Sequence, residues 1–288
     1  MTRIVYTADI HGNLALYRAA GEGAARWGAD AIIVGGDLCP ETHPFDRMPQ
    51  SQPDFLLRNV APLVEAWKRT QPNLRVFAIP GNDDFQTILP ALELLEQRGL
   101  IENPHRKAAT LGAYTLVGLA FVPPTPFSIK DFERRDLVGP AGQPIQLFRR
   151  VLGTSHGVRE LADFRAYLDS QPSIQEELHE LDGLLAGDSQ RLIAVIHSPP
   201  ANTRCDVLST GQHIGSMAVR RWIERRQPLL TLHGHIHESP DMSKAFCDRI
   251  GVTRVVNPGS DKRTPHLVFI DLENLDAMEH SIYARQRT

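Results

Sequence analysis

The sequence is poor in cysteine, and none of its apolar runs is long enough to cross a membrane. Its three cysteines, Cys39, Cys205 and Cys247, form no CxxC pair. We therefore expect no disulfide framework, and we expect a reducing compartment, which points to the cytoplasm. No stretch approaches the ~18 apolar residues that a membrane-spanning helix needs, so we expect no membrane partner.

A strong excess of charge of one sign is also missing. The formal net charge is -3 at pH 7, and the sequence pI is ≈ 6.5. A protein that holds nucleic acid mainly through its phosphates usually has a clustered basic excess, so we expect nucleic acid only as a substrate. The basic pairs Arg220-Arg221 and Arg225-Arg226 have helical spacing and are typical of a solvated helix face.

The sequence does contain an ordinary globular composition arranged as alternating strands and helices. Hydrophobic residues make up 42% and charged residues 23% of its 288 positions, as in a typical globular protein. Apolar runs of strand length, such as Ala31–Val34 and Leu192–Ile196, alternate with helical patterns such as Leu14–Trp27. This alternation predicts an α/β fold with helices packed outside the sheet, as a single domain over residues 1–288.

Polar residues of the kinds that bind metal ions follow five of these apolar runs. In α/β sheets, ligands bind beyond the carboxyl ends of the strands, so we expect these side chains to meet at one edge. Each of them alone is equally typical of a turn residue, a helix cap or a locally bonded histidine. The set as a whole is Asp9, His11, Asp37, Asn82, His197, His235 and His237.

Nitrogen and oxygen ligands without thiolate suit Mn, Fe, Zn or similar divalent ions rather than a structural zinc finger. Seven ligands are more than one four-coordinate tetrahedral site can use. They fit two divalent ions that share one bridging carboxylate, an arrangement in which ions ~3.5–4 Å apart clamp a phosphoryl group and activate water.

Five short motifs in this order resemble the signatures of the calcineurin-like metallophosphoesterases. The motifs are Asp9-Ile10-His11, Gly36-Asp37, Gly81-Asn82-Asp83-Asp84, His197 and Gly234-His235-Ile236-His237. The resemblance implies a four-layer α/β/β/α sandwich of two mixed β-sheets flanked by helices. It also implies a dinuclear metal site at the strand ends and hydrolysis of small phosphate esters.

The resemblance further implies a role for each ligand. Asp9, His11 and His237 would hold one ion, whereas Asn82, His197 and His235 would hold the other. Asp37 would bridge the two ions. A hydroxide between them would attack phosphorus in line, which gives Asp37 and Asn82 catalytic roles as well.

Asp83 departs from the family pattern, because the third signature usually has a histidine there that stabilises the transition state or protonates the leaving group. Two nearby cations should lower the pKa of Asp83, which leaves an anion that cannot donate a proton at neutral pH. Family branches that lack this histidine are often described as phosphodiesterases. The resemblance therefore favours a phosphodiester substrate.

Two hypotheses address the missing acid. In the first, His213 acts in catalysis and, with Ser216, binds the substrate, because Ser216 precedes a predicted helix whose N-terminal amides could bind an anion. The alternative for His213 is a loop histidine with local hydrogen bonds. In the second hypothesis, the substrate has a good leaving group and needs no acid.

The segment at about 122–157 is rich in proline and irregular in pattern. It predicts a long loop or small cap that closes over the substrate, with an ordinary surface excursion as the alternative.

Two other functions of the protein also stay open. One is a catalytically degenerate binding scaffold. The other is a nuclease of the same family, whose groove would use Arg134, Arg135, Arg149 and Arg150.

Overall fold

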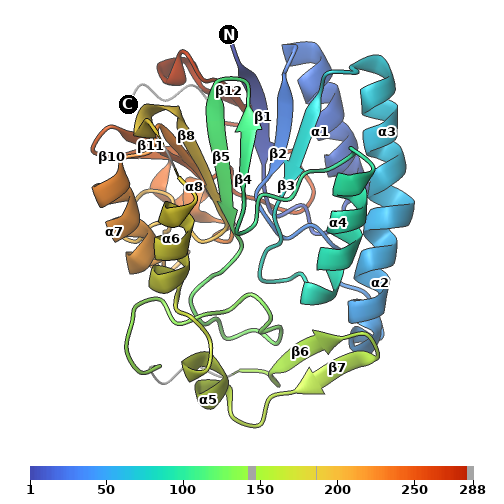
Figure 1. The fold of residues 1–288 in the computed structure, drawn as a ribbon, viewed down its shortest axis with the longest axis vertical. Helices are drawn as coiled ribbons and strands as arrows, with labels where there is room; N and C mark the ends of the chain where they lie inside the picture. The colour runs from blue at the N-terminus through green and yellow to red at the C-terminus, as the bar shows by residue number, and fades with distance from the viewer. Residues whose placement is uncertain (142–146, 186, 284–288) are drawn as a thin grey trace.

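The computed structural model describes residues 1–141, 147–185 and 187–283, and within them the chain forms two large β-sheets (Figure 1). The first sheet contains β1 (Arg3–Thr7), β2 (Ala31–Val34), β3 (Arg75–Ala78), β12 (Val268–Asp271) and β13 (Glu279–His280), in the order β13-β12-β1-β2-β3. The second contains β4 (Ala108–Leu111), β5 (Tyr114–Leu119), β8 (Leu192–Ile196), β9 (Leu230–Leu232), β10 (Cys247–Ile250) and β11 (Thr253–Val256), in the order β10-β11-β9-β8-β5-β4.

Helices flank both sheets (Figure 1). The longer ones are α1 (Leu14–Trp27), α2 (Met48–Phe55), α3 (Ala61–Thr70), α4 (Leu89–Gln97), α6 (Ile174–Gly183) and α7 (Met217–Arg226). The shorter elements include α5 (Phe164–Asp169), α8 (Ser239–Ser243), the 3-10 turn η3 (Gln86–Ile88) and the hairpin of β6 (Val151–Thr154) and β7 (Gly157–Glu160).

The alternation of side chains along the strands builds four layers. Val5 and Ile32 of the first sheet pack in the core beneath α1 and α3, whereas their neighbours Ile4 and Ile33 face the second sheet. The outer face of the second sheet packs against α6 and α7, where Trp222 is fully buried. The predicted α/β/β/α sandwich of two mixed sheets is therefore confirmed.

The carboxyl ends of the parallel strands meet at one edge of the sandwich. Strands β1, β2 and β3 are parallel neighbours in the first sheet, as are β5, β8 and β9 in the second. In Figure 1, β1 runs down from the N-terminus, so these ends lie at the lower edge of the sheets. This edge collects the loops 8–13, 35–39 and 79–85 from one sheet, and 197–202 and 233–238 from the other.

Helix α2 begins at Met48 although it contains two prolines. Pro49 lies in its first turn, where a missing N–H costs nothing, and Pro53 lies within the helix. A π-helical turn at Leu56–Val60 then joins α2 to α3.

The segment 122–157 lies at the same end of the molecule as the strand ends. Its described parts, 122–141 and 147–157, contain loops and strand β6, and residues 142–146 lie outside the described residues. The carboxylate of Asp131 accepts hydrogen bonds from the N–H of Gln86 at 3.0 Å and that of Gly153 at 3.0 Å. These bonds tie β6 to η3, close in sequence to Asn82. In Figure 1, β6, β7 and α5 lie below the two sheets.

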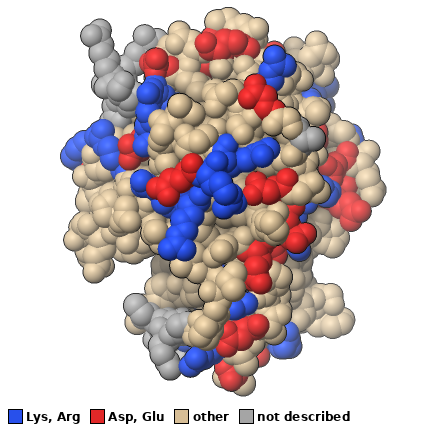
Figure 2. Space-filling view, turned by 60° about the vertical axis from the view of Figure 1, so that its left-hand side comes forward, with Lys and Arg blue, Asp and Glu red and all other residues tan. Residues whose placement is uncertain are grey.

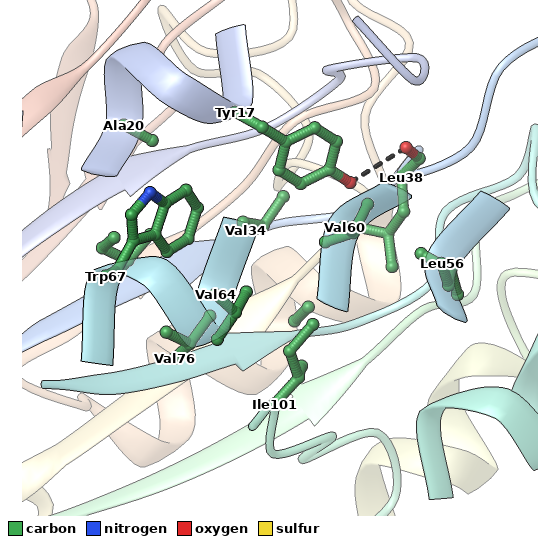
Figure 3. Close-up of a pocket in the computed structure, with 12 residues that line it drawn as sticks. Tyr17, Ala20, Val34, Leu38, Leu56, Val60, Val64, Trp67, Val76 and Ile101 are labelled. Carbon is green, nitrogen blue, oxygen red and sulfur yellow. Dashed lines mark hydrogen bonds between the residues drawn. The ribbon is translucent and has the colours of Figure 1, made fainter. Parts of the chain in front are cut away.

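A small cavity of about 10 Å³ lies between the first sheet and its helices (Figure 3). Val64, Trp67 and Ile101 contribute to its lining, and the hydroxyl of Tyr17 donates to the carbonyl of Leu38 at 2.9 Å. A cavity of this size holds about one water molecule at most, and an apolar lining gives water no partners. We interpret it as a packing gap in the core rather than as a ligand site.

The described surface is mixed in charge and offers no membrane-spanning element. Figure 2 shows Lys and Arg side chains interspersed with Asp and Glu on the face that carries the left-hand elements of Figure 1. On α7, Arg220 pairs with Glu224 at 2.6 Å and Arg225 with Asp182 at 2.9 Å, as expected of a solvated helix face. Among the described helices, none combines the length and apolarity needed to span a bilayer.

Candidate metal centre

The loops at the strand ends have an unusual backbone. Four of the seven expected ligands adopt left-handed conformations: Asp9 (φ 55°), His11 (φ 46°), Asp37 (φ 51°) and His235 (φ 67°). Such conformations are uncommon for residues other than glycine and cost roughly 1–3 kcal/mol each, so they persist where the surrounding structure imposes them. Their concentration at one edge is typical of a functional site.

Glycines let these loops approach one another closely. A Cβ atom at Gly81 would lie 2.2 Å from Asp37 Oδ1 and 2.7 Å from His197 Nε2. A Cβ atom at Gly234 would lie 2.6 Å from Asp9 Oδ2. Any larger residue at either position would push a ligand away, which explains the glycine that precedes Asn82 and the one that precedes His235.

Four acidic and imidazole side chains converge on one side of this edge. The ligand atoms of Asp9, His11, Asp37 and His237 all lie within 4.8 Å of one another. His11 Nε2 is 3.2 Å from His237 Nε2, which is 3.5 Å from Asp9 Oδ1. Two ligands of a tetrahedral ion with ~2.05 Å bonds lie about 3.3 Å apart, so this spacing suits a shared divalent cation.

A second convergence lies around His197. Its Nδ1–H donates to the carbonyl of Gly35 at 2.8 Å, which turns Nε2 toward Asn82 Oδ1 at 3.2 Å and Asp37 Oδ2 at 3.5 Å. A backbone carbonyl on the far nitrogen is the usual support of a metal-binding histidine. Because these facing atoms are acceptors when His197 is neutral, a proton or a cation must lie among them. The His235 ring lies 5.4 Å from that of His197, centroid to centroid.

Burial and charge act against each other in the pKa values of these groups. Burial lowers the pKa of His235 to about 3 and that of His11 to about 4. Burial opposes protonation of His197 too, but the charge of Asp37 raises the pKa of His197 to about 9. Burial would raise the pKa of Asp37, yet His197 holds it below the usual range. A metal ion would replace the proton of His197, because imidazole binds metals in its neutral form.

Asp83 lies beside the bridging position. Its N–H donates to Asp37 Oδ1 at 2.8 Å, and its carboxylate accepts from Asn82 Nδ2 at 2.8 Å. We expected cations to lower its pKa. In the protein itself, burial first and then the charge of Asp37 raise the pKa of Asp83 above that of an ordinary carboxyl group. This direction holds without bound metal ions, so the lowering of the pKa by two cations stays a prediction for the metal-loaded site; the Asp83 side chain is 38% exposed.

Asp84 is a supporting residue to which sequence reasoning gave no role. Its buried carboxylate accepts hydrogen bonds from the N–H groups of Gly81 at 2.9 Å, Leu38 at 3.0 Å and Cys39 at 2.9 Å. It therefore ties the loop after β2 to the loop after β3. Its place at the end of the Gly-Asn-Asp-Asp run was the signal that could have found it, because buried aspartates in such loops often bind backbone N–H groups.

A family model described as calcineurin-like phosphoesterase matches residues 2–239. The chain belongs to this family. No curated protein sequence matches the chain significantly. Since members of the family carry dinuclear metal centres, the Asp and His cluster described above is a site that can hold metal.

Two solved structures illustrate how the phosphoesterase fold extends over the whole chain. The protein TT1561 of Thermus thermophilus is 17% identical in sequence, and the match covers 97% of this chain and 98% of the TT1561 chain with a TM-score of 0.56. A dimetal phosphatase from Danio rerio is 13% identical in sequence, and the match covers 100% of this chain and 96% of the phosphatase chain with a TM-score of 0.58. At such low identity the likeness concerns the fold alone.

In this member of the calcineurin-like phosphoesterase family, an anionic side chain of the protein lies at the N-terminus of the expected helix. Ser216 is the N-cap of α7, as predicted, but its buried hydroxyl donates to Asp136. The carboxylate of Asp136 also accepts from the N–H of Met217 at 2.8 Å. This arrangement does not favour the assignment of Ser216 to substrate binding, because the Asp136 side chain lies where we expected the substrate anion.

His213 has a local partner in the loop before α7. Its Nδ1 lies 2.7 Å from Oδ1 of the buried Asp206, whose carboxylate also accepts from the N–H of Thr203 at 2.8 Å. The His213 side chain is 41% exposed. The local hydrogen bond considered as the alternative is present, and it directs Nε2 away from Asp206.

Arg134, Arg135 and Arg149, three of the four arginines considered for a nucleic-acid groove, make contacts within the protein. Arg134 donates to the carbonyls of Asp131 at 3.1 Å and Glu133 at 2.8 Å. Arg135 donates to the carbonyl of Leu168 at 3.0 Å. Arg149 forms ion pairs with Asp46 and Glu160. The contacts of Arg134 lie within the segment 122–157, and those of Arg135 and Arg149 hold it to its neighbours, so they do not favour the nuclease hypothesis.

Proposed function

We propose that the protein is a metal-dependent hydrolase of small phosphate esters, with phosphodiesters as the preferred class. The observation that carries the proposal is the convergence of His197 Nε2, Asn82 Oδ1 and Asp37 Oδ2, with the Nδ1–H of His197 bonded to Gly35. These acceptor atoms face one another in a buried place, where a proton on His197 or a metal ion must lie among them, and a bound metal ion would replace that proton.

In this proposal, Asp9, His11 and His237 hold one divalent ion, and Asp37 bridges to a second. Asn82, His197 and His235 hold the second ion. Two bound divalent ions would lower the pKa of water and neutralise charge on the phosphoryl oxygens. Manganese, iron, zinc or a similar ion suits these nitrogen and oxygen ligands.

The preference for diesters follows from the charge near Asp83. A phosphodiester carries one negative charge at neutral pH, whereas a monoester carries nearly two. The partly exposed carboxylate of Asp83, bonded to Asn82, repels the doubly charged group more strongly. The absence of a histidine at this position also fits a substrate with a good leaving group.

The segment 122–157 forms a cap over the site in this proposal. Its support is the pair of hydrogen bonds that the Asp131 carboxylate accepts from the N–H groups of Gln86 and Gly153, and the position of β6, β7 and α5 below the strand ends in Figure 1. We also infer a cytoplasmic location, because Cys39, Cys205 and Cys247 are all free and buried.

The test combines metal analysis with turnover of chromogenic bis(p-nitrophenyl) phosphate and p-nitrophenyl phosphate in added manganese. We expect about two divalent ions per chain and a higher kcat/KM for the diester. Metal-loaded protein that hydrolyses neither compound would contradict the proposal and favour a binding scaffold. Cleavage of single-stranded oligonucleotides that weakens steeply with salt would favour a nuclease.

His213 is our candidate for the missing acid, with Asp206 orienting its ring at 2.7 Å. If it protonates the leaving group, His213→Ala should lower kcat about 10²-fold on an alkyl ester and should flatten the basic limb of the pH–rate profile. The p-nitrophenyl ester should lose much less, since its leaving group needs no acid. An unchanged rate and pH profile on the alkyl ester would show that His213 is a loop residue.

A further inference from the structure

Lys262 lies in a turn that is hydrogen-bonded to the loop of Asp9 and to the loop of His237, which both belong to the first ligand cluster. Its carbonyl oxygen accepts a hydrogen bond from Asn13 Nδ2 at 2.9 Å, and its N–H donates to Ser260 Oγ at 3.1 Å. Ser260 donates through its hydroxyl to the carbonyl of Asp9 at 2.9 Å, and through its N–H to that of His237 at 3.1 Å. The backbone of Lys262 is thus fixed relative to the ligands of one ion.

Lys262 places a positive charge in this turn. The Lys262 side chain is exposed, and the part of the chain that the structure describes gives it no ion pair. The adjacent Asp261 instead accepts from N–H groups of its own turn.

The turn also holds Lys262 in a costly conformation. Its φ of 61° lies in the left-handed region, which lysine rarely adopts, and the bonds to Asn13 and Ser260 hold it there. An exposed ammonium group offers three donors to a phosphoryl oxygen. At the same edge, Asp83 brings a negative charge where the family signature has a histidine.

We propose that Lys262 binds a phosphoryl oxygen of the substrate beside Asp9, His11 and His237. It supplies a positive charge beside the ligands of this ion. The inference rests on the proposed function and deepens it, because it names a residue that determines specificity for the phosphate group.

Binding of inorganic phosphate to the manganese-loaded protein, measured by titration calorimetry, tests the proposal without turnover. We expect Lys262→Met to weaken phosphate binding about tenfold, as for one exposed charge-assisted hydrogen bond. Lys262→Arg should restore most of the affinity. The matched control is Arg263→Met, which removes a charge from the same turn and should bind phosphate like the wild type. Mass spectrometry should find the same metal content in all three variants.

Equal phosphate affinities for Lys262→Met and the wild type would overturn the proposal. Equal weakening in Arg263→Met would overturn it too, because the effect would then be one of overall charge. A wild type that binds phosphate but hydrolyses no ester would contradict the proposed function alone, and Lys262 would still be judged by the dissociation constants. A metal-loaded wild type that binds no phosphate would contradict both.

Discussion

Asp37→Asn is expected to lower kcat/KM for phosphate esters by at least about 10³-fold, because the neutral amide cannot bridge two cations and several kcal/mol of charge stabilisation would be lost. The amide keeps the shape of the carboxylate and can still accept the N–H of Asp83, which lies 2.8 Å from Oδ1. The fold should therefore survive. Steady-state kinetics and metal analysis on the same preparation measure the effect, and we expect less than two ions per chain.

The matched control is Asp54→Asn, an acidic residue on the surface that pairs with Arg58 at 3.5 Å and is 58% exposed. It should retain wild-type activity and metal content. Full activity of Asp37→Asn with two ions bound would show that Asp37 does not bridge them. Loss of activity together with loss of the folded state would instead assign Asp37 a structural role, which circular dichroism distinguishes.

Lys130→Met is expected to destabilise the protein by about 3–5 kcal/mol, since it leaves the carboxylate of Glu133 buried without its cation. Lys130 is 1% exposed and Glu133 0% exposed, and Nζ lies 2.7 Å from Oε1. The ammonium group also donates to the carbonyl of Thr125 at 3.0 Å. Urea unfolding followed by fluorescence measures the loss. If the segment 122–157 unfolds before the two-sheet sandwich, the loss of stability should appear in the first of the two unfolding transitions.

The loss caused by Lys130→Met should depend on pH. Burial raises the pKa of Glu133 to about 7 even with Lys130 present. A carboxyl group whose pKa is higher in the folded state binds its proton more tightly there, so its contribution to stability falls as pH rises from about 4.3 through 7. The variant should therefore lose less stability at pH 5.5 than at pH 8.

Two further variants make the Lys130 prediction specific. The double variant Lys130→Met/Glu133→Leu should recover much of the lost stability, because no buried charge remains. Lys107→Met breaks a pair with Glu96 at a similar distance, 2.8 Å, but Lys107 is 55% exposed, so it should cost no more than about 1 kcal/mol. Equal losses for Lys130→Met and Lys107→Met would show that burial does not control the cost.

Local patterns in the sequence located most of the fold. The strand Ala31–Val34 and the helix Leu14–Trp27 agree with the structure to the residue, since apolar periodicity reports directly on which face an element buries. The short edge strands β4 and β10 were not predicted. Each has four residues of which only some are buried, so neither strand has a continuous apolar run that the sequence could show.

The sequence by itself determined which residues stand at the strand ends and in what order, and with them the family and the candidate ligands. Tertiary structure alone decided how they meet, because a side chain's partners depend on packing between segments far apart in the chain. His11 lies 3.2 Å from His237 although 226 positions separate them. The same long-range packing placed Asp136 at the N-terminus of α7, where we expected the substrate to bind. It also brought the backbone of Lys262, which no motif marked, close to the loops that carry the metal ligands.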